Sequence, residues 1–339
     1  MAALKKRIGK VFTHFGVKKK ALGVYFFFFN GQKDLVAFYR KKVIPLTVRR
    51  RSANGIYAIV LDSDWLGLGA RIVKTIEILL YCEERGLIPA IKYNYLEKGH
   101  GKADYFGELF CYKGPDAERV SAKAKYTSIR DIDELGWPED YNRKLKLSFA
   151  KTLFDKYFSI CPEILAEVDS FCKDRFGANR VLGVHYRGTD KAGEAPLVAK
   201  ERLIDYIKEA IGEDLRFNAL FVSTDDEVLL RFLKNSDLPV PVLFREDAVR
   251  SSDGDQFHRK KEISKSVINR DAIVNMLIMS RCSFLIKTAS ILSDCSVLFN
   301  PEIKVRVISF PHSDNLTWWP ATEINASNRS LIPADAYGR

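Results

Sequence analysis

Short aliphatic segments alternate with amphipathic segments from residue 181 to residue 309, and this alternation restricts the fold more than any other feature. The aliphatic segments, which we predict to be strands, are residues 181–186, 219–223, 241–244, 284–287 and 305–309. The intervening segments carry apolar residues at helical spacing and cover residues 197–211, 225–234, 269–281 and 289–299. Strands that alternate with helices form a parallel sheet covered on both faces.

A shorter pattern of the same kind lies nearer the N-terminus. A predicted strand at residues 56–61 is followed by Gly67-Leu68-Gly69, a predicted helix over residues 70–84 and a strand over residues 88–93. This β–glycine loop–α–β unit is typical of doubly wound sheets. Because 339 residues are too many for one ordinary core, we expect an α/β protein with two doubly wound, Rossmann-like domains. The two domains would face each other across a cleft lined by strand carboxyl ends.

Four segments organise the chain in this interpretation. We expect a basic aromatic arm at residues 1–51, an α/β domain at residues 52–175, a second α/β domain at residues 176–312, and a C-terminal tail at residues 313–339 that packs back. Residues 143–176 carry the pattern of one or two amphipathic helices, broken near Pro162. This helical stretch would link the two domains.

The net charge of +11 belongs to the N-terminal arm. Residues 1–51 hold 14 basic residues and one acidic residue, whereas the other 288 residues hold 40 basic and 42 acidic residues. Basic clusters beside aromatic residues suit an anionic membrane surface, so a peripheral membrane contact through residues 1–30 is one hypothesis. A solvated tail with an edge strand is the other. Since the body is near neutral, nucleic-acid binding is disfavoured.

The apolar run at residues 21–29 is too short to span a bilayer, and no small-residue cleavage site follows it. We therefore expect a cytoplasmic protein, with the arm at the inner membrane face if it binds lipid. The six cysteines are scattered, without a CxxC pair or a His/Cys cluster. We expect reduced core thiols, no disulfide framework and no metal site.

Polar residues crowd the end of the first strand of the long alternating region. His185, Arg187, Thr189, Asp190 and Lys191 lie within seven residues. A guanidinium there can hold a diphosphate through two parallel hydrogen bonds, which an ammonium cannot do. Negative charge develops on a diphosphate leaving group, so Arg187 would act mainly in the transition state, with Asp190 orienting it. From composition alone, a salt-bridged turn at the strand end is the alternative.

Three ordered motifs resemble one known family. His185-x-Arg187-x-Thr189-Asp190-Lys191 resembles the first motif of the α1,6/α1,2/protein-O-fucosyltransferase superfamily, most closely its α1,6 branch. That branch includes the core fucosyltransferases of N-glycans and the rhizobial nodulation fucosyltransferase. The strand end Thr224-Asp225-Asp226 resembles the second motif, and residues 271–301 resemble the third.

The resemblance implies a GT-B fold and an inverting transfer of fucose from GDP-fucose without a metal. It implies that Arg187 binds the β-phosphate, that His185 binds the ribose or nearby backbone, and that Asp225 and Asp226 support the nucleotide. The C-terminal domain would bind this nucleotide-sugar donor. The acceptor, a glycan or a lipid-linked glycan, would bind mainly to the N-terminal domain.

The resemblance also implies a catalytic set and a phosphate pocket. The α1,6 branch places a general-base glutamate just after its lysine, and here Glu194 follows Lys191 with two residues between them. We predict that Glu194 deprotonates the acceptor hydroxyl, with Asp190 and Lys191 completing the catalytic set. Thr288 and Ser290 would line the phosphate pocket at a helix N-terminus, which is a ready anion site.

Several positions depart from the family pattern. Gly188 stands where the core fucosyltransferases carry a second Arg, and Asn275 stands where an Asp commonly reads the guanine base. The pair Ser290-Ile291 replaces Ser-Ser, and Asp271, one turn before Asn275, is a candidate substitute for the missing Asp. These departures leave two alternatives open. One is a transferase that uses another nucleotide sugar, and the other is a non-catalytic glycan- or nucleotide-binding protein of the same fold.

Three further residues are candidates for the opposite wall of the cleft. Gly67, Gly69 and Arg71 stand at the start of the predicted helix at residues 70–84, where they could approach the donor or acceptor. A lone Gly-x-Gly is also a common turn, and that interpretation stays open.

Overall fold

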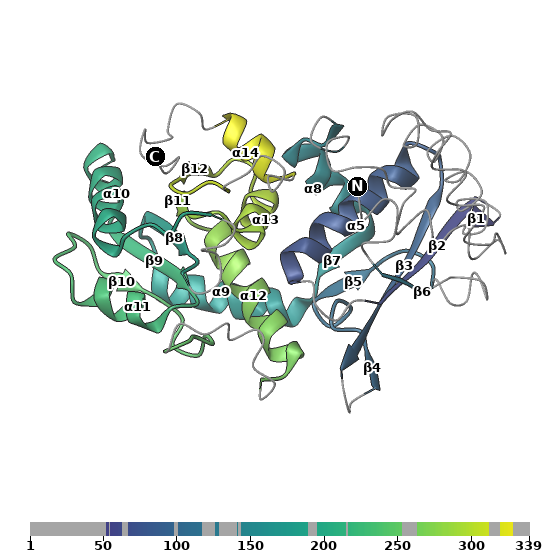
Figure 1. Cartoon of the computed structure of the whole chain (residues 1–339), viewed down its shortest axis with the longest axis horizontal. Helices are drawn as coiled ribbons and strands as arrows, with labels where there is room; N and C mark the ends of the chain where they lie inside the picture. Colours follow the sequence, from purple (N-terminus) through teal and green to yellow (C-terminus); the bar gives the residue numbers. More distant parts are fainter. Residues whose placement is uncertain are drawn as a thin grey trace, which may run out of the picture. The chain divides into compact units, whose positions relative to one another are not determined.

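The structure is a computed structural model that describes residues 52–53, 55–62, 67–97, 101–116, 126–128, 141, 144–188, 195–214, 216–252, 263–311 and 319–327 (Figure 1). The predicted arm at residues 1–51 lies outside the described residues. The proposed membrane contact of residues 1–30 therefore stays a prediction.

The described chain forms two compact units that do not follow chain order. The first unit contains a mixed sheet and residues 78–83 of helix α5 (Leu68–Glu83). The second unit contains residues 67–77 of that helix, residues 104–113, and the elements from residue 144 onward. The boundary therefore falls inside a helix.

The sheet of the first unit contains the predicted β–α–β pattern. Its strands are β1 (Ser52–Ala53), β2 (Ile56–Asp62), β3 (Ile88–Glu97), β4 (Gly101–Ala103) and β6 (Tyr126–Ser128). Strand β2 runs parallel to β3 and β6, whereas β1 and β4 pair antiparallel with their neighbours. Helix α5 joins β2 to β3, and Gly86, with a φ of 59°, follows its end. A left-handed residue after a helix is a common stop signal that favours glycine.

The sheet of the second unit is parallel throughout, as predicted. Its strands are β8 (Val181–Tyr186), β9 (Ala219–Thr224), β10 (Val242–Leu243), β11 (Phe284–Lys287) and β12 (Lys304–Val307). Their order across the sheet is β10-β9-β8-β11-β12, and every pair is parallel. This is the doubly wound order, in which the chain reverses its direction of travel across the sheet between β8 and β11.

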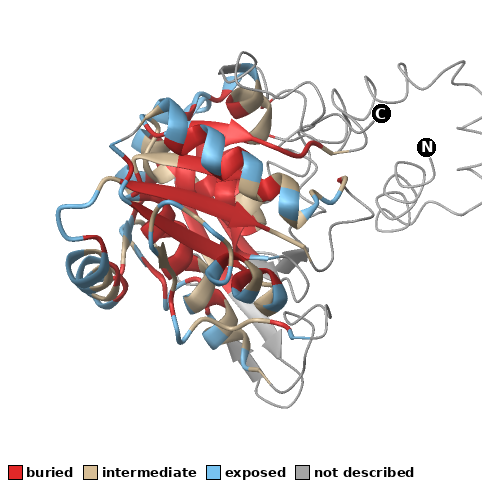
Figure 2. Ribbon diagram, turned by 90° about the vertical axis from the view of Figure 1, so that its left-hand side faces the viewer, coloured by how far each residue is buried: buried red, intermediate tan, exposed pale blue. Residues whose placement is uncertain are grey.

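Helices cover both faces of this parallel sheet, and their apolar sides explain why. The crossovers are α10 (Lys200–Glu213), α11 (Glu227–Lys234), α12 (Lys265–Ser280) and α13 (Ile291–Phe299). Helices α10 and α11 pack on Leu182, Val184 and Tyr186 of β8. The alternate residues of β8 face the other way, since a Cβ on Gly183 would meet Cys282 after α12. Figure 2 shows the buried strands between helices whose outer surfaces are exposed.

The segment before this sheet, predicted to be helical, contains helices and also one short strand that was not predicted. Helix α8 (Leu147–Tyr157) and helix α9 (Pro162–Phe171) are followed by a π-helical turn at Cys172–Phe176. The break near Pro162 is confirmed, because this proline occupies the first turn of α9. The break also contains a strand, β7 (Phe158–Ile160), which pairs antiparallel with β5 (Phe110–Tyr112). The helical prediction for residues 158–160 is therefore wrong.

Helix α14 (Ala321–Ser327) contacts α8 within the second unit. The Glu323 carboxylate accepts a hydrogen bond from the Leu147 main-chain N–H over 2.8 Å. This contact caps the start of α8, where the N-cap side chain makes no such bond.

Candidate functional site

The candidate site lies where the second unit's sheet reverses its winding. Strands β8 and β11 are neighbours there, and Lys287 pairs in register with His185. Ligands of open α/β sheets bind outside the strand carboxyl ends at such a point. The motifs at His185–Arg187 and Thr288–Ser290 therefore meet at one edge of the sheet.

Two hydrogen bonds join the ends of these strands. The Thr288 main-chain N–H donates to the His185 carbonyl oxygen over 3.1 Å. The Arg187 main-chain N–H donates to the Thr288 hydroxyl oxygen over 3.0 Å. The threonine thus continues the strand pairing for one more residue, and it fixes the backbone that carries the Arg187 side chain.

Asp225, which directly follows β9, contacts Arg187 from the other side. Its Oδ2 lies 3.8 Å from the Arg187 Nε, and its Oδ1 accepts a 3.4 Å hydrogen bond from the Gly188 main-chain N–H. The Asp225 side chain is 10% exposed and that of Arg187 is 24% exposed. A partly buried carboxylate beside a guanidinium restricts its orientation, which is the role that sequence reasoning gave to Asp190.

The neighbouring Asp226 has a different environment. Its Oδ1 accepts hydrogen bonds from the main-chain N–H groups of Val228 and Leu229, at 2.7 and 3.0 Å. Asp226 is thus the N-cap of α11, and its Oδ2 lies 4.0 Å from the Lys200 Nζ. Of the two adjacent carboxylates, Asp225 contacts the arginine and Asp226 begins a helix.

Gly188 stands where the related pattern has arginine, and the packing explains the substitution. A Cβ at this position would lie 2.5 Å from the Cε1 of Tyr186. The Tyr186 ring cannot easily move, because its hydroxyl donates a 2.8 Å hydrogen bond to the Val198 carbonyl oxygen. A side chain at residue 188 is therefore incompatible with this placement of Tyr186.

His185 is buried and electrically neutral. Burial, followed by the charges of Lys287 and Arg187, lowers its pKa to about 3. Its Nδ1 atom has no hydrogen-bond partner within the described part of the chain. A neutral imidazole has one donor and one acceptor nitrogen, so it can pair with a hydroxyl in either sense.

Sequence reasoning missed a buried ion pair beside this histidine. The Nζ of Lys287 lies 2.8 Å from the Oδ1 of Asp294, and the two side chains are 2% and 3% exposed. The contact is a close approach of opposite charges without the alignment of a good hydrogen bond. The available signal was a lysine ending an aliphatic strand and an aspartate inside an apolar helix.

The start of α13 lies beside Thr288. Ser290 is its N-cap, and the Asp294 main-chain N–H donates to the Ser290 carbonyl oxygen over 3.1 Å. The Ser290 side chain makes no capping hydrogen bond. The first N–H groups of a helix carry partial positive charge and suit an anion.

The first turn of α5 reaches the same helix start. A Cβ on Gly69 would lie 3.0 Å from the Ile291 Cγ2 and 3.1 Å from the Leu292 nitrogen. The Cys295 thiol also approaches the Gly69 carbonyl oxygen at 3.7 Å. Gly69 therefore lets two backbones pack closely. Arg71 is buried on the next part of this turn, whereas Gly67 is exposed.

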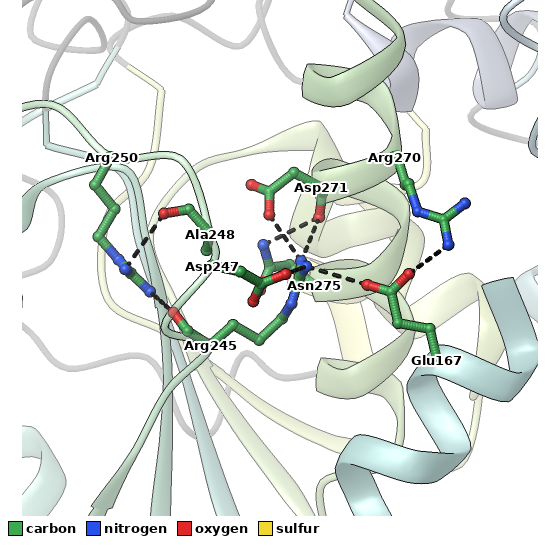
Figure 3. A network of polar contacts seen from close by, with 8 residues as sticks. All are labelled: Glu167, Arg245, Asp247, Ala248, Arg250, Arg270, Asp271 and Asn275. Atoms are coloured by element: carbon green, nitrogen blue, oxygen red, sulfur yellow. Dashed lines mark hydrogen bonds and ion pairs between the residues drawn. The ribbon is translucent and has the colours of Figure 1, made fainter.

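Asp271 and Asn275 lie on α12 within a separate polar network (Figure 3). The buried Arg245 guanidinium contacts Asp271 at 2.7 Å, Asp247 at 2.6 Å and Glu167 at 3.1 Å. Burial raises the pKa of Asp271 to about 6 despite the Arg245 charge. The Asn275 Nδ2 donates to the Asp271 carbonyl oxygen over 3.0 Å. The structure thus gives both residues intramolecular partners.

Three predicted catalytic residues, Asp190, Lys191 and Glu194, lie outside the described residues. Their roles remain predictions. The chain is described again from Ala195, which is buried, and the Pro196 carbonyl oxygen accepts a 2.7 Å hydrogen bond from the Ser309 hydroxyl.

The second unit also contains a cavity of about 520 Å³ at a different place. Its lining includes Ser280 and Arg281, which precede β11, and Asn300, which precedes β12. These residues mark the amino ends of the strands. The cavity therefore lies at the opposite edge of the sheet from the carboxyl-end residues His185 and Thr288.

Two further observations apply to the described ranges only. No group of three or more His, Cys, Asp or Glu side chains in them could hold a metal ion. No helix in them has the length and apolar character needed to cross a membrane. All six cysteines are free; Cys111 is exposed and Cys172 is partly buried, so the expectation of core thiols fails for these two.

Neither a protein-family model nor a curated protein matches the chain. Solved structures do match. A NodZ α1,6-fucosyltransferase soaked with GDP-fucose has a TM-score of 0.47 and 16% identity, over 74% of this chain and 93% of that chain. POFUT1 in complex with GDP-fucose has a TM-score of 0.45 and 10% identity, over 76% of this chain and 99% of that chain.

A third match is a mutant of Arabidopsis thaliana FUT1 in complex with GDP, with a TM-score of 0.46 and 12% identity, over 85% of this chain and 80% of that chain. All three of these structures resemble the chain at TM-scores below 0.5 and at identities of 16% or less.

Proposed function

We propose that this chain is an inverting glycosyltransferase of GT-B type that transfers fucose from GDP-fucose to a hydroxyl of a glycan or lipid-linked glycan. One observation carries the proposal. Arg187 stands at the carboxyl end of β8, beside the N-terminus of α13, where the doubly wound sheet reverses. A cation and a helix N-terminus at this point suit a diphosphate.

The donor would bind through its diphosphate. The Arg187 guanidinium can donate two parallel hydrogen bonds to phosphate oxygens, and Asp225 restricts its direction. The main-chain N–H groups after Ser290 would face the same anion. His185, neutral at physiological pH, would exchange hydrogen bonds with a donor hydroxyl.

The reaction would be a single displacement at the anomeric carbon. The acceptor oxygen forms a bond to that carbon, the bond from the carbon to the β-phosphate oxygen breaks, and the acceptor proton passes to Glu194. Negative charge grows on the leaving diphosphate, so the fixed charge of Arg187 stabilises the transition state more than the ground state. Asp190 and Lys191 belong to the same proposed catalytic set, and the proposal uses no metal.

A different nucleotide sugar is the second candidate, and the α12 network favours it. Asp271 is paired with Arg245, and the Asn275 amide nitrogen donates to the backbone. Reading the N1–H and N2–H of guanine takes two acceptors, which a carboxylate supplies and one amide oxygen does not. A base that needs fewer acceptors would fit these residues as they stand.

Calorimetric titration with GDP, GDP-fucose, UDP and ADP tests the donor assignment. We expect micromolar binding of GDP and GDP-fucose by the wild-type protein, and loss of at least about tenfold in affinity in Arg187→Ala. Arg216→Ala is the matched control, because Arg216 is 74% exposed and paired with Asp214. Tighter binding of UDP or ADP would mean that the donor is a different nucleotide sugar. If none of these nucleotides binds, the proposed transferase function is wrong.

Turnover separates an enzyme from a binding protein of the same fold. We expect GDP release from GDP-fucose in the presence of a glycan acceptor, and its loss in Glu194→Gln with donor affinity retained. Nucleotide binding without turnover, unaffected by Glu194→Gln, would favour the non-catalytic alternative.

The proposed cytoplasmic protein would contact the inner membrane face through residues 1–30. Deletion of these residues should therefore abolish flotation with anionic liposomes.

A further inference from the structure

The Lys287–Asp294 ion pair is buried directly beside the proposed donor site. Lys287 is the last residue of β11 and pairs in register with His185 of β8. Asp294 lies on the first turn of α13, and each side chain is at most 3% exposed. Among the described residues, Asp294 is the charged group that contacts the Lys287 ammonium.

Stability alone does not explain this pair. Removing two charges from water carries a large desolvation cost, so replacing a buried pair by apolar residues is often neutral or stabilising. Burial raises the pKa of Asp294 even with Lys287 beside it, which reflects the same desolvation cost. The pair therefore suggests a role in geometry.

The ion pair closes a short turn. It connects the end of β11 to the first turn of α13, across the turn residues 288–290. At the end of this turn, the Ser290 carbonyl oxygen accepts hydrogen bonds from two residues of α13, the Ser293 hydroxyl at 3.0 Å and the Asp294 N–H at 3.1 Å. The turn has little freedom while both ends are held.

The same turn holds the backbone of Arg187. Thr288 is the residue directly after Lys287, and it accepts from the Arg187 N–H and donates to the His185 carbonyl oxygen. A displacement of Thr288 would release the Arg187 main chain. The ion pair is thus connected to the proposed diphosphate-binding guanidinium through one residue.

We propose that Lys287 and Asp294 are positioning residues, whose buried ion pair fixes the turn at residues 288–290 so that Thr288 holds Arg187 in place for the donor diphosphate. This inference rests on the proposed function for the identity of the donor, but its structural part does not need the donor. The first turns of α13 also lie close to α5, because Ile291 and Cys295 approach Gly69.

The charges around His185 fit this arrangement. Lys287 faces the imidazole from β11, Arg187 from its own strand, and Asp294 is the carboxylate that balances Lys287 from α13. Ser223, its register partner on β9, carries no charge. Burial first, and then the charges of Lys287 and Arg187, lower the pKa of the imidazole, so His185 stays in the form that can both donate and accept hydrogen bonds.

The test compares the charged pair with an apolar pair of similar size. Lys287→Met combined with Asp294→Leu removes both charges without leaving one buried and unpaired. Lys304→Met is the matched control, because Lys304 is an exposed lysine on the adjacent strand β12. Lys287→Arg keeps the positive charge and tests rescue. If the apolar pair does not fold, Lys287→Gln combined with Asp294→Asn serves in the same measurements, because it also leaves no charge buried and unpaired.

Amide hydrogen exchange of the free protein gives the first readout. In the apolar pair, we expect the Arg187 and Thr288 amides to exchange at least about tenfold faster, because local opening lowers protection. The Val184 and Leu285 amides, inside their strands, should keep wild-type protection, as should all four in Lys304→Met. Unchanged exchange at Arg187 and Thr288 in the folded variant would overturn the inference.

Calorimetric titration with GDP-fucose gives the second readout. We expect the apolar pair to bind at least about tenfold more weakly than wild type, with Lys287→Arg in between. Faster exchange with wild-type affinity would overturn the positioning role. If the wild-type protein itself fails to bind GDP-fucose, the proposed function fails, and the exchange data alone decide whether the ion pair holds the turn.

Discussion

The hydroxyl oxygen of Thr288 accepts a 3.0 Å hydrogen bond from the main-chain N–H of Arg187. This contact joins two segments that are about a hundred residues apart in the chain. It connects Thr288, in the third sequence motif, to Arg187, in the first motif. An N–H that loses its partner in a buried setting costs about 1–3 kcal/mol. The position of the Arg187 main chain therefore depends on the Thr288 hydroxyl.

Thr288→Val removes the hydroxyl and keeps the shape of the side chain. We expect GDP-fucose affinity to fall about tenfold, since about 1.4 kcal/mol corresponds to that ratio. Thr152→Val is the control, because the Thr152 hydroxyl donates to the Ser148 carbonyl oxygen on the exposed side of α8. Calorimetry on both variants checks the difference, and equal affinities would contradict it.

Gly188→Ala should destabilise the protein through Tyr186. The added Cβ would lie 2.5 Å from the tyrosine ring, which its bond to the Val198 carbonyl oxygen holds. We expect a loss of about 1–3 kcal/mol in the free energy of unfolding. Gly212→Ala is the matched control, because a Cβ on this helical glycine meets nothing within 4 Å. That change should stabilise by about 0.5–1 kcal/mol in urea unfolding.

Cys111 should be the first thiol to react in the native protein. It is exposed, and its sulfur lies 3.1 Å from that of Cys161. Burial raises the pKa of Cys161 to about 12, that of Cys82 to about 12 and that of Cys172 to about 11. Iodoacetamide needs a thiolate, so we expect peptide mass spectrometry to find one modified cysteine at early times. Early modification of Cys82 would contradict this packing.

Much of the second unit's fold follows from sequence pattern. The segments predicted as strands at residues 181–186 and 284–287 match β8 and β11 residue for residue. Such strands are buried on both faces, so they appear as continuous aliphatic runs. The strand β7 was missed because its three residues carry no period and its partner β5 is distant in sequence.

The candidate site was only partly predictable. The chemistry of Arg187 and His185 was visible, because a dense group of polar residues directly after a buried strand is typical of a ligand site in α/β sheets. The contact of Asp225 with Arg187 and the Lys287–Asp294 ion pair could not be predicted, since each depends on which strands become neighbours. The clash that requires Gly188 depends on one ring position, and no sequence pattern encodes it.

Asp271 should lower the free energy of unfolding as the pH rises. Its folded pKa of about 6 exceeds the ordinary value of 3.8, so the folded protein binds more protons between these values. Its contribution is therefore present below about pH 4 and is lost as pH rises through about 6. Asp271→Asn removes this term. In urea unfolding, the variant should gain stability more steeply than wild type over that interval, and an unchanged slope would contradict the buried placement.

His185 should have the opposite effect, because its contribution to the free energy of unfolding increases as the pH rises. Its folded pKa of about 3 lies below the ordinary value of 6.5, so the unfolded chain binds the extra proton in between. Its contribution is fully present above about pH 6.5 and falls by up to about 1.4 kcal/mol for each pH unit below that value. Its imidazole resonances should not titrate between about pH 5 and 8. A His185 signal that titrates near 6.5 would mean that the ring is exposed and free of the Lys287 charge, and the neutral hydrogen-bonding role would fail with it.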